Sequence, residues 1–582
     1  MNKYYSREKN TQIIIHLLKA HRINKVITSP GTANMALVGS IQNDPYFKCY
    51  SSVDERSAAY LACGLAEETG EPVVLTCTGA TASRNYLPGL TEAYYRKLPV
   101  LAITSVSSLY TGHLIPQVID RSVMPVDTVN LSLQLPIVKD KDDYWHCEIS
   151  VNRAILELSR YGGGPVHLNL PTTYDKLFDV KEIPQCKVIK RITLSDEFPE
   201  LKNGNIGIFI GSHLRMKTEE INVIEKFCEV NNAAVFCDHT SNYTGKYRLP
   251  FALAGSQNML DKTPLLPDVL IHIGEVSGDY YTQSISGKNV WRVSEDGELR
   301  DRFRKLKYVF QMKEKEFFEA YSNSVAKKEE QESYFEKCNK IFSEIAKSIP
   351  ALPFSNIWVA SKISNLIPKN SVVHLAILNS LRAWNFFEID KSVSLSSNVG
   401  GFGIDGMLST LVGASLSNTE KLYFGVVGDL ALFYDMNVLG NRNVQNNVRI
   451  LLINNGKGTE FRNASHAAEA VFGVDTDEHI AAAGHFGNKS ELLVKNYAEN
   501  LGYEYFSAST KNQFEVHYKR FLTTEVTDRP MLFEVFTDSK DESDALEAIL
   551  NIEVNVKSKA KDMARQMLGR KGISILKKIA RK

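Results

Sequence analysis

The sequence YFGVVGDL at residues 423–430 is followed, after one connection, by VRILLINNGKG at residues 448–458. Each stretch begins as a short apolar run and ends in a polar turn that contains Asp429 or Asn455. Short, continuously apolar strands are typical of parallel sheets that helices cover on both faces. Ligands bind at the carboxyl ends of such strands, so the two turns predict one site at the edge of a sheet.

The polar groups of these turns suit a hard metal ion. A carboxylate, an amide oxygen and a turn carbonyl are the oxygen ligands that Mg²⁺ prefers when it holds a diphosphate. A lone Gly-Asp pair is common and often marks only a turn that caps a helix. The combination of Gly428-Asp429 with Asn454-Asn455, each closing a strand, is much more specific.

The rest of the chain repeats the alternation of strand and helix. Residues 25–28, 49–53, 73–77 and 100–104 are predicted strands, with helices predicted at 33–41, 55–69 and 82–97. Further strands are expected at 166–170, 206–210, 234–237, 269–273 and 372–376. Alternation of this kind predicts right-handed crossovers and parallel sheets. We therefore expect an α/β protein of three doubly wound parallel-sheet domains with a basic C-terminal tail.

The length supports several domains. A chain of 582 residues is too long for one ordinary domain. We place the domains at residues 1–180, 190–335 and 345–552, and the tail at 553–582. A Lys-, Pro- and Asp-rich linker is predicted near 171–203 and a charged, helix-prone bridge at 313–347.

The overall charge conceals a segregation. The chain has 68 Lys and Arg and 67 Asp and Glu, a net charge of +1, which argues against a nucleic-acid-binding protein. Residues 555–582 hold ten basic side chains and one acidic side chain, so the tail carries +9 and the remainder −8. The tail is expected to be solvated or docked on the acidic body. Contact with an anionic membrane surface or partner is the alternative.

The sequence also predicts a compartment. Eight scattered cysteines without a CxxC pair indicate reduced thiols, and no apolar run reaches the roughly 18 residues of a membrane-spanning helix. The first 22 residues lack a signal-peptide cleavage pattern. We expect a cytoplasmic protein.

Together these motifs resemble the thiamine-diphosphate-dependent 2-oxo-acid decarboxylase/carboligase superfamily. The matching parts, in family order, are SVDERSAAYLACGLA (52–66), GDLALFYDMN (428–437) and INNGKG (453–458). Within that superfamily the chain resembles the SEPHCHC synthases of menaquinone biosynthesis. The stretches that carry this likeness are SPG (29–31), GATA (79–82), GPVHLNLP (164–171), NSL (379–381), GIDG (403–406) and GDL (428–430).

The resemblance implies pyrimidine-binding, middle and diphosphate-binding domains, with thiamine diphosphate and Mg²⁺ as cofactors. It implies that Glu55 bonds the cofactor's pyrimidine ring, and that Ile404 is the apolar wedge that bends the cofactor. Asp429 and Asn455, with the main-chain carbonyl of Lys457, would bind the metal. The further implied residues are Gly79, Gly428 and Leu430 at the cofactor and His113 and Gln117 near the reacting centre.

The implied reaction is decarboxylation of a 2-oxo acid and transfer of the acyl carbanion to an acceptor, in a homodimer or homotetramer whose active sites lie at the interface. The arginines that hold the relatives' polyanionic substrates are missing: Ala33, Trp384 and Val399 occupy three of their positions. An altered substrate is therefore expected, such as pyruvate. The candidate substrate contacts are Asn34, Arg382, Trp384 and Arg462.

Two other functions stay open at this point. The enzyme could follow acetolactate-synthase-like chemistry or simple decarboxylation, and nothing in the middle block indicates a flavin. A catalytically inactive regulatory relative is the second alternative. Retention of Glu55, Asp429 and Asn455 favours an enzyme, since an inactive copy has no reason to keep all three.

Overall fold

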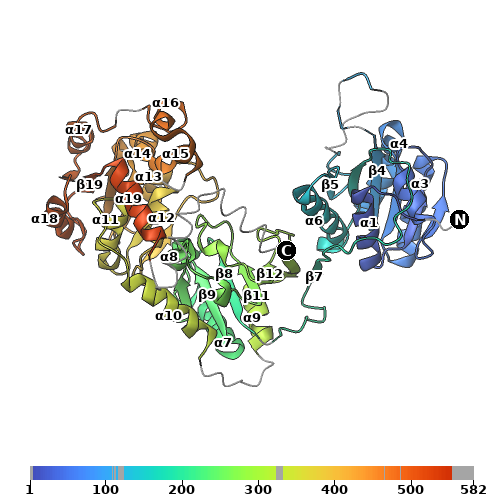
Figure 1. Cartoon of the computed structure of the whole chain (residues 1–582), viewed down its shortest axis with the longest axis horizontal. Helices are drawn as coiled ribbons and strands as arrows, with labels where there is room; N and C mark the ends of the chain where they lie inside the picture. Colours follow the sequence, from blue (N-terminus) through green and yellow to red (C-terminus); the bar gives the residue numbers. More distant parts are fainter. Residues whose placement is uncertain are drawn as a thin grey trace, which may run out of the picture. The chain divides into compact units, whose positions relative to one another are not determined.

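The computed structural model describes residues 4–107, 109–110, 113–115, 124–202, 204–322, 332–463, 466–484 and 487–552. Its strands form three parallel sheets, which confirms the predicted α/β class (Figure 1). The chain divides into two compact units. The first contains Met1–Phe198 and Trp291–Met312, and the second contains Pro199–Val290 and Lys313–Lys582. Gln117 and the basic tail lie outside the described residues.

The first unit is built around a six-stranded sheet in the order β2-β1-β3-β4-β6-β5. Its strands are β1 (Lys25–Thr28), β2 (Lys48–Ser51), β3 (Val73–Thr78), β4 (Val100–Val106), β5 (Leu131–Gln134) and β6 (Val166–Pro171). Its helices are α1 (Lys9–Ala20), α2 (Met35–Ile41), α3 (Glu55–Thr69), α4 (Ala80–Asn85), α5 (Leu87–Tyr95) and α6 (Lys141–Glu157). The two central strands β3 and β4 are almost wholly buried, as expected for strands whose sequences, VVLTCT and VLAITSV, are mostly apolar and contain no charged residue.

Two details of this unit differ from the sequence-based expectation. The helix predicted at residues 82–97 is two helices, α4 and α5, and Pro88 lies in the first turn of α5, where its missing N–H breaks no helical bond. The predicted linker contains a short strand, β7 (Lys190–Ile192), that pairs with β13 (Leu306–Gln311). Strand β12 (Asn289–Ser294) precedes β13.

Helix α3 carries the acidic motif of the first unit. The Asp54 side chain caps the helix by accepting a hydrogen bond from the Ser57 N–H at 2.7 Å. Small residues on the inner face of α3 allow α5 to approach closely: a Cβ on Gly89 would lie 2.4 Å from the Cβ of Ala59. The helix start, with Glu55 as its first residue, is thus fixed both by its cap and by packing.

In the second unit, four parallel strands have the order β10-β9-β8-β11. They are β8 (Ile206–Ile210), β9 (Ala233–Cys237), β10 (Arg248–Pro250) and β11 (Val269–Ile273), with helices α7 (Thr218–Asn231) and α8 (Ala252–Ser256). The predicted bridge forms α9 (Glu314–Ser322) and α10 (Tyr334–Lys347). Because α10 packs on α8 and β9, this segment is part of the fold and not a bare connection.

The same unit contains a six-stranded sheet in the order β15-β14-β16-β17-β19-β18. Its strands are β14 (Val372–Leu375), β15 (Ser394–Ser396), β16 (Tyr423–Gly428), β17 (Val448–Asn454), β18 (Glu504–Ala508) and β19 (Met531–Phe536). Its helices are α11 (Asn356–Ile363), α12 (Asn379–Asn385), α13 (Met407–Ser415), α14 (Asp429–Asp435), α15 (Ala467–Phe472), α16 (Thr476–His479), α17 (Leu492–Asn500), α18 (Lys511–Phe521) and α19 (Ser539–Leu550). Strands β16 and β17 are direct neighbours, with Gly428 opposite Ile453.

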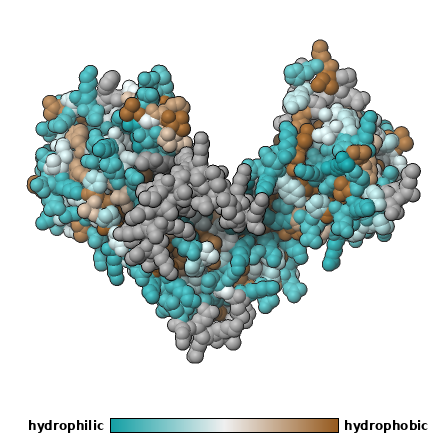
Figure 2. All heavy atoms as spheres, in the orientation of Figure 1, coloured by the Kyte–Doolittle hydropathy of each residue, from teal (hydrophilic) through white to brown (hydrophobic). Residues whose placement is uncertain are grey.

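The surface, the cysteines and the helices bear on membrane spanning and on disulfide bonding. Apolar side chains are interspersed among polar ones over the visible face (Figure 2). All eight cysteines lie in the described residues, and no disulfide joins any of them. Within the described ranges, no helix combines the length and the apolar character that crossing a membrane requires.

Candidate functional site

A cavity lies at the carboxyl ends of β14, β16 and β17 in the second unit. The cavity is open on one side, and its empty space, counted together with the solvent at its mouth, is about 820 Å³. All six of the diphosphate, metal and wedge residues predicted for this part of the chain line it, namely Ile404, Gly428, Asp429, Leu430, Asn455 and Lys457. Strands β16 and β17 end side by side, and this adjacency brings their two terminal motifs to one place.

Asp429 is the first residue of α14 and is only 2% exposed. Burial raises the pKa of its carboxyl group to about 7, although the N–H groups of Leu430 and Gly456 stabilise the charged form. The negative charge of Glu534 adds to the increase in that pKa. A buried carboxylate of this kind is stabilised when a cation binds it, so the position fits a metal ligand.

The two adjacent asparagines have different roles. Asn454 donates to Glu534 Oε1 at 2.6 Å and to the Gly487 carbonyl at 3.2 Å, so it connects β17 to its neighbours. Asn455 lines the cavity, and its Oδ1 accepts a bond from the Lys457 N–H at 3.3 Å. Gly456, which lies between Asn455 and Lys457 in the sequence, has a φ of +79°, which residues with a Cβ rarely adopt. The turn therefore presents Asn455 and Lys457 together.

The donor set fits Mg²⁺ better than a softer metal. The side-chain and main-chain oxygens of Asp429, Asn455 and Lys457 are all hard ligands. Among the described residues there is no cluster of three or more His, Cys, Asp or Glu side chains with metal-binding geometry. A site with one carboxylate, one amide and one carbonyl is compatible with that finding.

Ile404 provides the apolar wall of the cavity. Its side chain is partly buried against the core that contains Met407 and Leu411. Gly406, two residues later, has a φ of +75° and forms the N-cap of α13. This turn holds Ile404 between the core and the cavity.

Sequence reasoning missed a carboxylate on the same wall. Glu542 of α19 lines the cavity, and burial raises its pKa to about 7. Its Oε1 accepts hydrogen bonds from the Asn356 N–H at 2.9 Å and from Thr537 Oγ1 at 2.7 Å. No local pattern marks this glutamate, because only the packing of α19 brings it to the cavity.

Arg382 was predicted to contact substrate, and the structure places it in an ion pair. Its guanidinium donates to both carboxylate oxygens of Glu460, at 2.8 and 2.9 Å, and to Asn379 Oδ1 at 2.9 Å. Glu460 and Asn379 line the cavity, whereas Arg382 lines an adjoining small pocket. Glu460 is a second residue that the sequence did not indicate.

Two other predicted substrate residues do not line this cavity. Trp384 is 0% exposed and lies in the core. Arg462 pairs with Glu469 at 2.5 Å and with Asp477 at 3.5 Å. Asp477 also accepts a 2.7 Å bond from Lys457 Nζ. The two basic side chains beside the metal motif are therefore neutralised within the chain.

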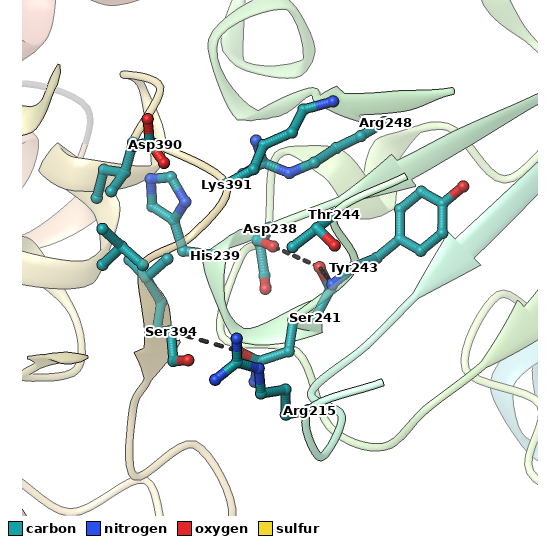
Figure 3. Close-up of a pocket in the computed structure, with 14 residues that line it drawn as sticks. Arg215, Asp238, His239, Ser241, Tyr243, Thr244, Arg248, Asp390, Lys391 and Ser394 are labelled. Carbon is teal, nitrogen blue, oxygen red and sulfur yellow. Dashed lines mark hydrogen bonds between the residues drawn. The ribbon is translucent and has the colours of Figure 1, made fainter. Parts of the chain in front are cut away.

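Helix α12, which carries Asn379 and Arg382, is anchored at its carboxyl end by His239. The His239 Nε2 lies 2.9 Å from the Trp384 carbonyl and 3.0 Å from the Phe387 carbonyl, so this nitrogen carries the proton. Burial lowers the pKa of His239 to about 4 and keeps the ring neutral. His239 lines a smaller pocket between the loop after β9 and residues 389–395 (Figure 3).

The remaining predicted residues lie in the first unit. Glu55 is half-buried at the start of α3, and Gly79 caps α4, where a Cβ would lie 2.5 Å from Val106 Cγ1. Asn34 is buried and donates to the Ser29 carbonyl at 3.0 Å, which stabilises the turn before α2. His113 is exposed. The predicted residues thus fall in both of the compact units.

Comparison with known proteins gives a family for this arrangement. Residues 9–124 match the model of the thiamine pyrophosphate enzyme N-terminal TPP binding domain. The 2-succinyl-5-enolpyruvyl-6-hydroxy-3-cyclohexene-1-carboxylate synthases of Bacteroides thetaiotaomicron and Phocaeicola vulgatus are each 30% identical to the chain, over 558 and 563 residues. Both alignments cover 93% of this chain and 98% of the relative. The synthase of Flavobacterium johnsoniae is 29% identical, with 92% and 97% covered. The chain therefore belongs to the thiamine-diphosphate-dependent enzyme family that contains the 2-succinyl-5-enolpyruvyl-6-hydroxy-3-cyclohexene-1-carboxylate synthases.

Proposed function

We propose that the protein uses thiamine diphosphate and Mg²⁺ to decarboxylate a 2-oxo acid and to transfer the resulting acyl unit to an acceptor. The observation that carries this proposal is the cavity that joins Asp429, Asn455 and Lys457 to the apolar wall at Ile404. A metal-bound diphosphate needs the first three residues, and the organic rings of the cofactor need the fourth.

Each residue has a definite task in this proposal. The side chains of Asp429 and Asn455 and the carbonyl of Lys457 hold the metal, and Ile404 orients the cofactor. Glu55 holds a proton at the pyrimidine ring. When bound, thiamine diphosphate supplies the electron sink that allows a 2-oxo acid to lose CO₂.

We also propose that the enzyme is a homodimer or homotetramer whose interface completes the site. Both units carry exposed apolar side chains in the segments concerned: Val53, Tyr60 and Leu61 in or next to the helix that begins at Glu55, and Val471, Phe472 and Val474 in the segment that follows the metal motif in the sequence. Surfaces of this composition are favoured at subunit contacts. A second copy would cover them, so Glu55 and Asp429 of one chain would serve different sites.

The substrate pocket is proposed to differ from that of the relatives. The relatives are named for a reaction product rich in carboxylates, whereas the cations near this cavity are already paired: Arg382 with Glu460, and Lys457 with Asp477. A desolvated substrate carboxylate without a partner costs several kcal/mol. A small 2-oxo acid such as pyruvate fits this wall better than 2-oxoglutarate with isochorismate.

A panel of 2-oxo acids, each assayed for CO₂ release and for ligation to an acceptor aldehyde or ketone, tests the proposal. Ligation of two pyruvate units would indicate acetolactate-synthase-like chemistry, and CO₂ without ligation would indicate a simple decarboxylase. Efficient formation of the relatives' named product by the purified protein would refute the altered specificity. Absence of turnover with every acid, despite cofactor binding, would favour an inactive regulatory relative.

A cytoplasmic location and contact of the tail with an anionic surface stay predictions.

A further inference from the structure

An arginine–glutamate pair lies at the cavity, with Glu460 in the cavity wall and Arg382 in an adjoining small pocket. Arg382 Nη1 donates to Glu460 Oε2 at 2.8 Å and Nη2 donates to Oε1 at 2.9 Å. This fork-to-fork arrangement is the geometry by which proteins recognise carboxylates. The guanidinium edge that could hold a substrate carboxylate is therefore filled by a carboxylate of the chain itself.

The pair is fixed on both sides before any ligand arrives. Arg382 Nη1 also donates to Asn379 Oδ1, and Asn379 Nδ2 donates to Thr459 Oγ1 at 2.9 Å, beside Glu460. The carboxyl end of the helix that carries Arg382 is held by His239, whose Nε2 donates to the Trp384 and Phe387 carbonyls. With side chains only 14% and 24% exposed, the pair is partly removed from water, which strengthens it against competing anions.

The electrostatics of the wall follow from this arrangement. Glu460 lines the cavity, whereas Arg382 lines an adjoining small pocket, so an entering ligand meets the carboxylate of the pair. Glu542 is a further acidic group on the same wall. A second carboxylate on the substrate would be repelled by the negative charge of Glu460. To replace Glu460 at the guanidinium of Arg382, it would have to leave water and would leave the Glu460 carboxylate without its partner.

We propose that Glu460, held by Arg382, determines specificity by taking the place of a substrate's distal carboxylate. The cavity then accepts 2-oxo monocarboxylates with a short uncharged side chain and rejects 2-oxo dicarboxylates. This inference rests on the proposed function, of which it names the substrate class.

The test uses the holoenzyme loaded with thiamine diphosphate and Mg²⁺. Glu460→Gln retains the shape of the side chain and leaves Arg382 with an uncompensated charge. The ratio of kcat/KM for 2-oxoglutarate to that for 2-oxobutyrate should rise at least tenfold. In the double variant Glu460→Gln/Arg382→Gln, which has neither charge, the rise should be absent. Glu504→Gln is the matched control, because it weakens the bidentate Arg520–Glu504 pair elsewhere and should leave the ratio unchanged.

A binding measurement separates this inference from the proposed function. Calorimetry with the unreactive acids succinate and butyrate needs no turnover. The wild-type protein should bind butyrate more tightly than succinate. The Glu460→Gln variant should bind succinate at least tenfold more tightly than the wild type does. If no acid releases CO₂ in any variant, the proposed function fails, and the succinate titration still decides the inference. An unchanged succinate affinity in a folded Glu460→Gln protein, or an equal gain in the double variant, would overturn it.

Discussion

Asp429→Asn should stabilise the metal-free protein at alkaline pH while abolishing its response to the metal-bound cofactor. Burial raises the pKa of Asp429 from 3.8 to about 7. Between these values the unfolded chain has lost the proton and the folded chain retains it, so stability falls as the pH rises. At about 1.4 kcal/mol per pKa unit, the wild type loses about 4 kcal/mol by pH 8 relative to pH 4.

Asparagine cannot ionise and does not incur this loss. Thermal melting of the apoprotein should therefore show Asp429→Asn above wild type at pH 8.5 and near it at pH 4.5. With thiamine diphosphate and Mg²⁺ the order should reverse, because the wild type gains stabilisation from a bound cation and the variant does not. The reasoning is refuted if the apo variant is less stable than wild type by the same amount at both pH values, or if the cofactor stabilises both proteins equally.

Three further results are expected. Glu542→Gln should raise the melting temperature of the apoprotein at pH 8.5 but not at pH 4.5. Burial raises the pKa of Glu542 to about 7, so at a pH above 7 the ionised carboxylate costs the folded wild type about 3 kcal/mol of stability. A change in melting temperature that is the same at both pH values would contradict this. Gly89→Ala should lower the free energy of unfolding by about 1–3 kcal/mol in urea denaturation, because its Cβ would overlap Ala59; a neutral effect would show that α3 and α5 can separate freely. Truncation before Asn555 should leave turnover intact. Loss of salt-sensitive binding to vesicles with anionic lipids would reveal a tail that contacts membranes, whereas unchanged binding would indicate a tail that is solvated or docked on the acidic body.

The parts of the site that lie in continuous motifs were predictable from the sequence. Asp429 and Asn455 each follow an apolar strand, and parallel pairing of β16 with β17 places the ends of these strands together. Ile404 and Lys457 came through the resemblance and line the same cavity. The α/β class followed from the same alternation of strand and helix.

The parts that depend on distant packing were not predictable. Glu542 reaches the cavity from the last described helix, and its hydrogen-bond partner Asn356 lies 186 residues earlier. Arg382 was expected to face substrate, but its partner Glu460 is 78 residues away and carries no signal of its own. Pro88 favours a helix start at its position, so the sequence did contain a signal for the second helix that the prediction of a single helix at 82–97 did not use.

Calorimetric titration of the purified protein with thiamine diphosphate in the presence of Mg²⁺ tests the central claim most directly. One cofactor should bind per chain in the wild type. Glu55→Gln should retain binding and lose CO₂ release, and Asp429→Asn should lose binding. Absence of binding to the folded wild-type protein, with Mg²⁺ present, would contradict the assignment of the cavity.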